Sequence, residues 1–314
     1  MRRFIHNVII LAIPLIIYLI IIAMIDPFNY LNISDLVDNS VKHRISHEVE
    51  PHLFKLIDFE NNPRRNITLG DSRTDRLYYS MNYEKWANLA YGGGSIKEMV
   101  ETFWWVVKEH ELDTVLIGLN LNLYNKYNKR FWVEETIETK KNFFSYAFNK
   151  CTFRSTFLIC KSLVSKKEIV VNEPPLNKEE FWEFQLTQTP KKFFEKYSFP
   201  DNYHQDLIDI STYCQQNKIK LIFWIPPSFI DFQNTISAYN LEDFNEQFKS
   251  DLMAIGELYD YEYENKLTID KDNFSDPLHF NYEIGRYIRD EITGKNPYLG
   301  RRQVIRETTQ SQEQ

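Results

Sequence analysis

The chain has 314 residues, of which 43% are hydrophobic and 15% are aromatic, so it carries enough apolar material for a large packed core. This composition excludes a mainly disordered, collagen-like or small disulfide-stabilised protein. The formal net charge of −7 argues against nucleic acid as the main partner, because phosphate recognition needs a basic surface.

The N-terminal region contains one uncharged apolar run, from Val8 to Ile25. As a helix with a rise of ~1.5 Å per residue it is about 27 Å long, close to the thickness of the hydrocarbon core of a bilayer. Arg2 and Arg3 precede the run and Asp26 follows it, so the positive-inside rule places the N-terminus in the cytoplasm. We expect a single-pass anchor in the inner or plasma membrane, with the main domain extracytoplasmic. A cleaved signal peptide is the alternative, although Ala-Met-Ile-Asp at the end of the run is a poor cleavage site.

The chain divides by composition into four segments. We expect a polar stalk at 27–61, with a helix around 41–57, after a cytoplasmic tip and anchor at 1–26. A globular domain at 62–295 follows, with a Phe-, Lys- and Glu-rich helical insertion at about 125–200. The polar tail at 296–314 is predicted to be disordered.

Four short apolar segments are typical of buried strands, and three of them end in a turn that contains glycine. The predicted strands are Asn66–Leu69, Asn88–Tyr91, Asp113–Ile117 and Lys220–Ile225. The three turns are Gly70-Asp71-Ser72, Gly92-Gly93-Gly94 and Gly118-Leu119-Asn120. Helical spacing predicts helices at Ile96–His110, Asp206–Asn217, 241–258 and Tyr282–Glu291. Strands that alternate with helices predict an α/β fold with a mainly parallel sheet covered on both faces, and the three turns then meet at one edge of that sheet.

The sequence also offers each part of a site with a nucleophilic serine, which needs a histidine base, a carboxylate and oxyanion donors. Ser72 is predicted at a strand-to-helix turn, where its hydroxyl would be exposed. Asp276 and His279 are three residues apart in a predicted loop at 270–279, so one turn can bring the carboxylate against the imidazole. The backbone N–H groups of Ser72 and Gly93 and the side-chain amide of Asn120 are candidate donors to an oxyanion.

These segments resemble the conserved blocks of SGNH (GDSL-type) hydrolases. Gly70-Asp71-Ser72 resembles the first block, Asn88 to Gly93 the second, Gly118-Leu119-Asn120 the third and Asp276 to His279 the fifth, in the family's order over roughly residues 62–292. The resemblance implies a flavodoxin-like three-layer α/β/α fold and serine-dependent acyl-ester chemistry. It also implies that Ser72 is the nucleophile, His279 the base and Asp276 its orienting partner, with Gly93 and Asn120 at the oxyanion.

Two residues depart from the family pattern. Arg73 stands where the first block has leucine, and Leu121 stands where the third block has aspartate. Asn122 is therefore an alternative to Asn120 as the oxyanion amide.

The anchor and the SGNH-like domain together resemble membrane-anchored members that O-acylate envelope polymers. The resemblance implies acyl (acetyl) transfer to, or esterase action on, a cell-envelope polysaccharide, beside a multi-pass membrane acyltransferase. The alternative is a catalytically degenerate scaffold, or a polymer-binding partner of such an acyltransferase.

No cofactor or metal is expected from the sequence. Gly92-Gly93-Gly94 fits neither of the glycine patterns of nucleotide-binding loops, and the three cysteines include no CxxC pair. Two alternatives remain open for the cysteines. Either Cys151 and Cys160 form a disulfide bridge and Cys214 is free, or all three are free buried thiols.

Overall fold

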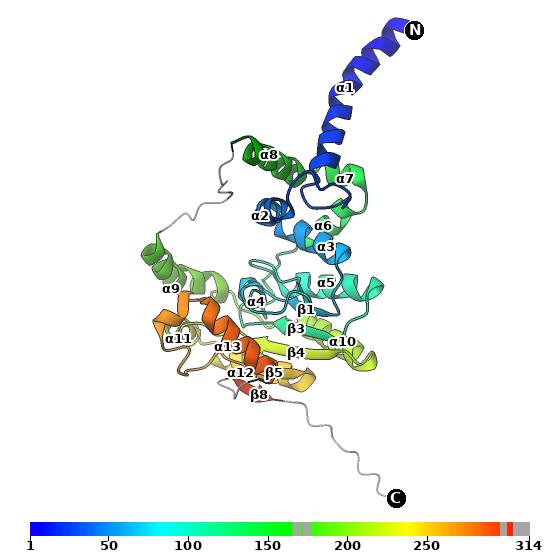
Figure 1. The fold of residues 1–314 in the computed structure, drawn as a ribbon. Coiled ribbons are helices and arrows are strands. Elements are labelled where there is room, and N and C mark those ends of the chain that lie inside the picture. The colour runs from blue at the N-terminus through cyan, green and yellow to red at the C-terminus, as the bar shows by residue number, and fades with distance from the viewer. Residues whose placement is uncertain (166–170, 172–176, 296–299, 304–314) are drawn as a thin grey trace, which may run out of the picture. The chain divides into compact units, whose positions relative to one another are not determined.

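The computed structural model describes residues 1–165, 171, 177–295 and 300–303, without the side chains of residues 2–11 and 301–303. The chain forms two compact units (Figure 1). The helical unit comprises Met1–Pro63 and Trp132–Pro174, and the sheet unit comprises Arg64–Phe131 and Pro175–Gln314. The predicted insertion at about 125–200 is therefore divided between the two units, and the predicted stalk at 27–61 lies within the helical unit.

The helical unit is built from six described helices. These are α1 (Arg2–Ile25), α2 (Asn39–Val49), α3 (Pro51–Asn61), α6 (Val133–Lys140), α7 (Phe143–Ala147) and α8 (Lys150–Ser165). The helix expected around 41–57 is two helices, because Pro51 cannot continue α2 and instead begins α3. Ile22, Leu53, Ile57 and Tyr146 are buried together and form part of the core of this unit.

The predicted anchor, Val8–Ile25, lies within α1. Among the described residues, no helix is long and apolar enough to cross a membrane. The side chains of the first part of the run, up to Leu11, lie outside the described residues, and the anchor stays a prediction.

The three cysteines are free, so the bridge considered between Cys151 and Cys160 is not formed. Both residues lie on α8, and nine residues of helix separate them by about 13 Å. A disulfide needs Cα atoms no more than about 7 Å apart, so the helix itself excludes the bond.

The sheet unit contains a six-stranded sheet in the order β2-β1-β3-β4-β5-β8. Its first five strands are parallel and β8 is antiparallel, which confirms the predicted α/β architecture with a mainly parallel sheet. The strands are β1 (Asn66–Leu69), β2 (Trp86–Asn88), β3 (Thr114–Gly118), β4 (Lys220–Ile225), β5 (Glu257–Asp260) and β8 (Arg301–Gln303). β8 lies inside the tail that was expected to be disordered. Residues 296–299 and 304–314 of that tail lie outside the described residues.

Seven helices of the sheet unit are described. These are α4 (Ser72–Tyr78), α5 (Ile96–Glu109), α9 (Lys178–Phe194), α10 (Asp201–Gln216), α11 (Ile230–Ala238), α12 (Glu242–Ile255) and α13 (Tyr282–Ile292). In the order of the sheet, β2 lies on one side of β1, and β3, β4 and β5 follow one another on the other side. Right-handed crossovers therefore place α4 on one face and α5, α10 and α12 on the other. The contacts of α4 with α13, and of α10 with α5 and α12, agree with these two layers.

Several predicted elements have other bounds in the structure, and the helix expected at Asp206–Asn217, for example, begins earlier, at Asp201. The strand expected at Asn88–Tyr91 lies earlier, at Trp86–Asn88, and the Asn88 side chain accepts the Ala90 N–H at 3.1 Å directly after it. The backbone beyond it still bonds to the β1 segment, because Leu89 N–H donates to the Thr68 carbonyl at 2.9 Å and Tyr91 N–H to the Gly70 carbonyl at 3.0 Å. The helix expected at 241–258 ends at Ile255, since Gly256 caps it in an extended conformation and β5 follows directly. The capping box at Ser95 and Glu98 is formed at the start of α5.

The core between the sheet and α4 is packed without room for a further methyl group near Thr74. Leu77 of α4, Leu116 of β3 and Trp224 of β4 are fully buried in this core. A Cβ atom at Gly118 would lie 1.8 Å from Thr74 Oγ1 and 2.6 Å from Trp224 Nε1. Only glycine therefore fits at the end of β3, where the backbone of the sheet meets α4.

We expect Gly118→Ala to lower the free energy of unfolding of the sheet unit by about 1–3 kcal/mol, because the added methyl group forces Thr74 or Trp224 to move. Gly92→Ala is the matched control, since a Cβ at Gly92 meets nothing within 4 Å. Urea unfolding followed by tryptophan fluorescence measures both variants. Equal midpoints for the two would contradict this account of the packing.

Candidate active site

Ser72 is the first residue of α4 and follows β1 by a two-residue turn. Asp71 caps the helix, because its carboxylate accepts the N–H of Arg73 at 2.9 Å. The turn depends on Gly70, where a Cβ would lie 2.1 Å from Thr74 Oγ1. The serine hydroxyl is thus presented at the carboxyl end of the sheet, beside the point where the strand order reverses between β1 and β3.

His279 and Asp276 lie on a small antiparallel hairpin made by β6 (Phe274–Asp276) and β7 (His279–Phe280). The predicted loop at 270–279 is therefore partly strand, with a short 3₁₀ turn at Lys271–Asn273 before it. The Asp276 carboxylate accepts the backbone N–H of Leu278 at 3.0 Å and of His279 at 3.2 Å. These two bonds close the turn and fix the carboxylate below the imidazole ring.

The three side chains form one chain of hydrogen bonds. His279 Nδ1 lies 2.8 Å from Asp276 Oδ2, and His279 Nε2 lies 2.6 Å from Ser72 Oγ. Burial raises the pKa of Asp276, but hydrogen bonds and the charge of His279 more than offset this effect, so the pKa is lowered and the carboxylate is ionised at neutral pH. An ionised carboxylate can only accept, so whenever the ring is neutral Nδ1 carries the proton and Nε2 accepts from the Ser72 hydroxyl.

Arg76, one turn after Ser72 on α4, joins this helix to the hairpin. Its guanidinium donates to Ser275 Oγ at 2.5 Å and to the carbonyl of Phe280 at 2.8 Å. Ser275 Oγ in turn donates to the carbonyl of His279 at 3.1 Å. Arg76 therefore holds the strand that carries His279 against the helix that carries Ser72, although the two residues are far apart in sequence.

A buried ion pair lies behind the serine. Asp71 Oδ2 accepts from Arg73 Nε at 3.1 Å and Nη2 at 3.0 Å, and from Asn120 Nδ2 at 2.9 Å. Burial raises the pKa of Asp71, but the charge and hydrogen bonds of Arg73 more than offset it, so the pKa is lowered. Arg73 is 3% exposed, so the residue that departs from the family pattern is a structural partner of the carboxylate.

The predicted oxyanion residues are placed differently from one another. Asn120 is 2% exposed and its amide donates to Asp71, and it is not among the residues that line the cavity at Ser72. Asn122, the alternative, lines this cavity and accepts from Arg73 Nη2 at 3.2 Å through Oδ1. Gly93 lines it too, with φ +68°, and its carbonyl accepts from Arg130 Nη1 at 3.1 Å.

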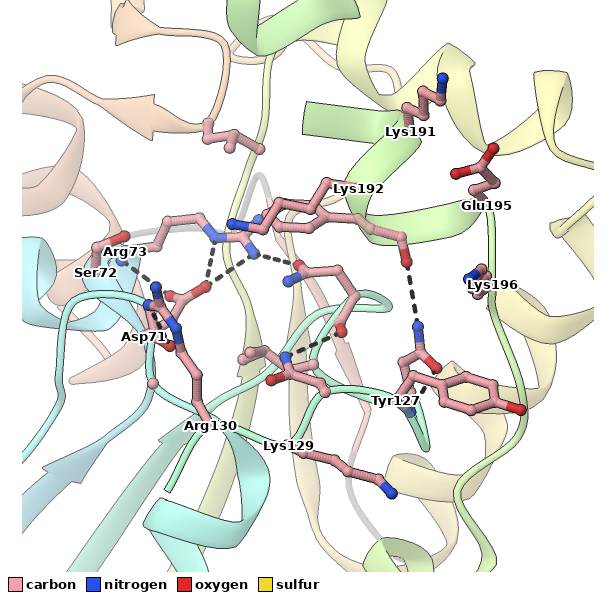
Figure 2. A pocket seen from close by; sticks show the side chains of 18 of the residues that line it. Asp71, Ser72, Arg73, Tyr127, Lys129, Arg130, Lys191, Lys192, Glu195 and Lys196 are labelled. Atoms are coloured by element: carbon pink, nitrogen blue, oxygen red, sulfur yellow. Dashed lines mark hydrogen bonds and ion pairs between the residues drawn. The ribbon is translucent and has the colours of Figure 1, made fainter. Parts of the chain in front are cut away.

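The cavity beside Ser72 and His279 has a volume of about 570 Å³, in the range of small-molecule sites, and all its lining residues belong to the sheet unit. Its other walls come from the segment around Arg130 and from the C-terminal end of α9 (Figure 2). Sequence reasoning assigned these segments to an insertion and missed their part in the site. The only available signal was the high lysine content of the insertion, which is also typical of a solvated surface.

No family model and no curated protein matches the chain. Three solved structures are similar to it. A GDSL-like lipase from Bacteroides thetaiotaomicron is 12% identical, with 78% of this chain and 98% of that chain covered and a TM-score of 0.38. A protein provisionally named an acylhydrolase, from Bacteroides fragilis, is 11% identical, with 78% and 96% covered and a TM-score of 0.38. A protein provisionally named a platelet activating factor, from Streptococcus pneumoniae, is 9% identical, with 81% and 95% covered and a TM-score of 0.43. Similarities at these scores establish no function for this chain.

The pair of Asp71 and Arg73 leads to a stability prediction. We expect Arg73→Met to lower the free energy of unfolding by about 3–5 kcal/mol at pH 7, because it leaves the buried Asp71 carboxylate without its counter-charge. The lowered pKa of Asp71 means that its contribution is present above the unfolded pKa of about 3.9 and is lost as the pH falls through the lower folded value.

The loss in Arg73→Met should therefore shrink as the pH is lowered from 7 towards 4, since the uncompensated carboxylate can then bind a proton. The double variant Asp71→Asn with Arg73→Met serves as the control and should show no such pH dependence. Urea unfolding at several pH values measures both variants. A loss in the single variant that is independent of pH would show that the ion pair is not its source.

Proposed function

We propose that the sheet unit is a serine acyl-ester enzyme of the SGNH type. The observation that carries this proposal is the continuous hydrogen-bonded chain from Ser72 Oγ through His279 to Asp276, at the mouth of a cavity. A serine that was only a helix cap would not need an imidazole at 2.6 Å that is itself oriented by an ionised carboxylate. This arrangement performs nucleophilic catalysis on unrelated folds, so its geometry supports the role independently of any family resemblance.

In the first half of the reaction, His279 Nε2 takes the proton of Ser72 while Oγ attacks the acyl carbon of an ester. Asp276 holds the Nδ1 proton and stabilises the imidazolium that forms. The tetrahedral intermediate then collapses, the ester C–O bond breaks, and His279 returns the proton to the leaving alcohol. The acyl group is left on Ser72 as an acyl-enzyme.

The negative oxygen of the intermediate needs donors that point at it. The N–H of Ser72 is one, because it is at the start of α4 and has no helical acceptor. We propose the N–H of Gly93 as the second and the amide of Asn122, in preference to Asn120, as the third. Both Gly93 and Asn122 line the cavity, whereas the Asn120 amide donates to Asp71.

In the second half, a hydroxyl group attacks the acyl-enzyme while His279 takes its proton. The bond between the acyl carbon and Ser72 Oγ then breaks, and His279 returns the proton to Oγ. Water gives an esterase, and a sugar hydroxyl gives an O-acyltransferase. We propose acyl (acetyl) transfer to, or removal from, a cell-envelope polysaccharide, and a multi-pass membrane acyltransferase as the partner that supplies acyl groups. The apolar run at Val8–Ile25 supports this reading, since an anchor would keep the enzyme at the envelope.

The nucleophile is tested with a serine-directed fluorophosphonate probe. We expect the probe to label the wild-type protein and not Ser72→Ala, and Ser72→Ala to hydrolyse 4-nitrophenyl acetate at least about 10³-fold more slowly. Ser237→Ala is the matched control, because this serine is exposed on α11 and does not line the cavity. An unlabelled wild-type protein without esterase activity would favour the alternative, a scaffold or polymer-binding partner of a membrane acyltransferase.

The location is tested separately, by fusing reporters to the C-terminus in a Gram-negative host. We expect an alkaline phosphatase fusion to be active and a green fluorescent protein fusion to be dark, because Arg2 and Arg3 hold the N-terminus in the cytoplasm. The described part of α1 supports an anchor, because Ile16, Ile17 and Ile20 are about half exposed and lipid would cover them. The reverse pattern of reporters would exclude an extracytoplasmic enzyme.

A further inference from the structure

The cavity beside Ser72 is lined by many more cations than anions. Its cationic side chains are Arg73, Lys129, Arg130, Lys191, Lys192 and Lys196, and its only carboxylates are Asp71 and Glu195. Asp71 and Arg73 neutralise each other, so five cations remain against Glu195. The whole chain has a net charge of −7, so the excess of positive charge is a local property of this cavity.

The cations come from two separate parts of the sheet unit. Lys129 and Arg130 follow β3, whereas Lys191, Lys192 and Lys196 lie at the end of α9 and just after it. Figure 2 shows that Arg130 and Lys192 extend from opposite walls toward the end of the cavity that holds Ser72 and Arg73. Two segments that are distant in sequence thus place positive charge next to the same hydroxyl.

Helix stability explains only part of this arrangement. Lysines in the last turn of a helix interact favourably with its dipole, and Lys191 and Lys192 occupy that position in α9. That role does not account for Lys129 or Lys196, which are outside the helix, nor for the direction in which Lys192 extends. In the described part of the chain, no ion pair joins Lys129, Lys192 or Lys196 to a carboxylate, so their charges are available to a ligand.

Arg130 is fixed in place more firmly than the lysines. Its Nη1 donates to the carbonyl of Gly93, and its own carbonyl accepts from Ser95 Oγ at 2.5 Å. A Cβ at Gly93 would lie 1.8 Å from Arg130 Nη1, so the two residues are in direct contact. One cation is therefore held rigidly beside the proposed oxyanion residue, and Lys192 lies opposite as a flexible point charge.

We propose that the substrate of the Ser72 site carries an anionic group, a phosphate or a carboxylate, which Lys192 and the neighbouring cations bind while the acyl ester reaches Ser72 Oγ. The inference rests on the proposed function for the ester chemistry and adds the charge of the substrate. Several cations in one cavity also raise the local concentration of an anionic substrate, and salt weakens this effect. A neutral ester gains nothing from these charges, so the site discriminates by charge as well as by shape.

The kinetic test compares three aryl acetates: phenyl acetate, 4-acetoxybenzoate and 4-acetoxyphenyl phosphate. We expect kcat/KM for at least one anionic ester to exceed that for phenyl acetate by about tenfold at low salt, and this preference to shrink at high salt. Lys192→Gln should reduce the preference about fivefold. Lys178→Gln, at the exposed start of the same helix and outside the cavity, should leave the preference unchanged. The two anionic esters distinguish a phosphate site from a carboxylate site.

A binding test separates this inference from the proposed function. Inorganic phosphate and benzoate are titrated into Ser72→Ala with and without Lys192→Gln, and we expect the second substitution to weaken the binding of the preferred anion about fivefold. Anion binding that depends on Lys192, together with a wild-type protein that hydrolyses none of the three esters, would support the anion site and overturn the proposed enzyme. Turnover of all three acetates without a charge preference, together with no anion binding, would overturn the anion site and leave the enzyme standing.

Discussion

The carboxylate of Asp71 is the group on which the arrangement of the site depends. It accepts the backbone N–H and the guanidinium of Arg73, together with the amide of Asn120. The first bond starts α4, the guanidinium bonds neutralise a buried charge, and the bond to Asn120 ties the end of β1 to the end of β3. One ionised side chain thus fixes where the helix begins and how two neighbouring strand ends are spaced. Because Ser72 is the next residue, its position follows from these bonds.

The second requirement is that a distant part of the chain meets that serine. The hairpin with Asp276 and His279 has only five strand residues, so it is not stable by itself. Arg76 stabilises the hairpin against α4, because it bonds to both strands of the hairpin from the same helix that begins with Ser72. Helix α4 therefore presents Ser72 at its start and holds His279 from its side. The short distance between Ser72 Oγ and His279 Nε2 results from these two roles of α4.

The parts of the fold and site that depend on local sequence could be predicted. The strands at Asn66–Leu69 and Lys220–Ile225 are apolar runs closed by glycine or proline, and both have the predicted bounds. The contact of Asp276 with His279 could be expected from their spacing of three residues, whereas their meeting with Ser72 was implied by the resemblance to SGNH hydrolases. By contrast, β5 was missed, since four residues directly after an amphipathic helix carry too little pattern to separate them from it.

What the sequence could not supply is the pairing of polar groups over long distances. Asn120 and Asn122 are equivalent by spacing, and only the bond from Asn120 to Asp71 separates a structural amide from one that lines the cavity. The sequence did not indicate the cations that line the cavity, for the same reason. Lys192 and Arg130 are far apart in the chain, and nothing local in a lysine-rich segment indicates that it closes over a site.

The two departures from the SGNH pattern bear on whether the site is active. Arg73 stands where the SGNH pattern has leucine. Taken from the sequence alone, this difference is compatible with a catalytically degenerate protein. In the structure Arg73 is buried, it neutralises Asp71, and it bonds to Asn122, so the substitution fits the charges that surround it. Leu121 is 2% exposed, as expected for a core residue between two asparagines with different partners. Both departures are therefore compatible with nucleophilic catalysis by Ser72.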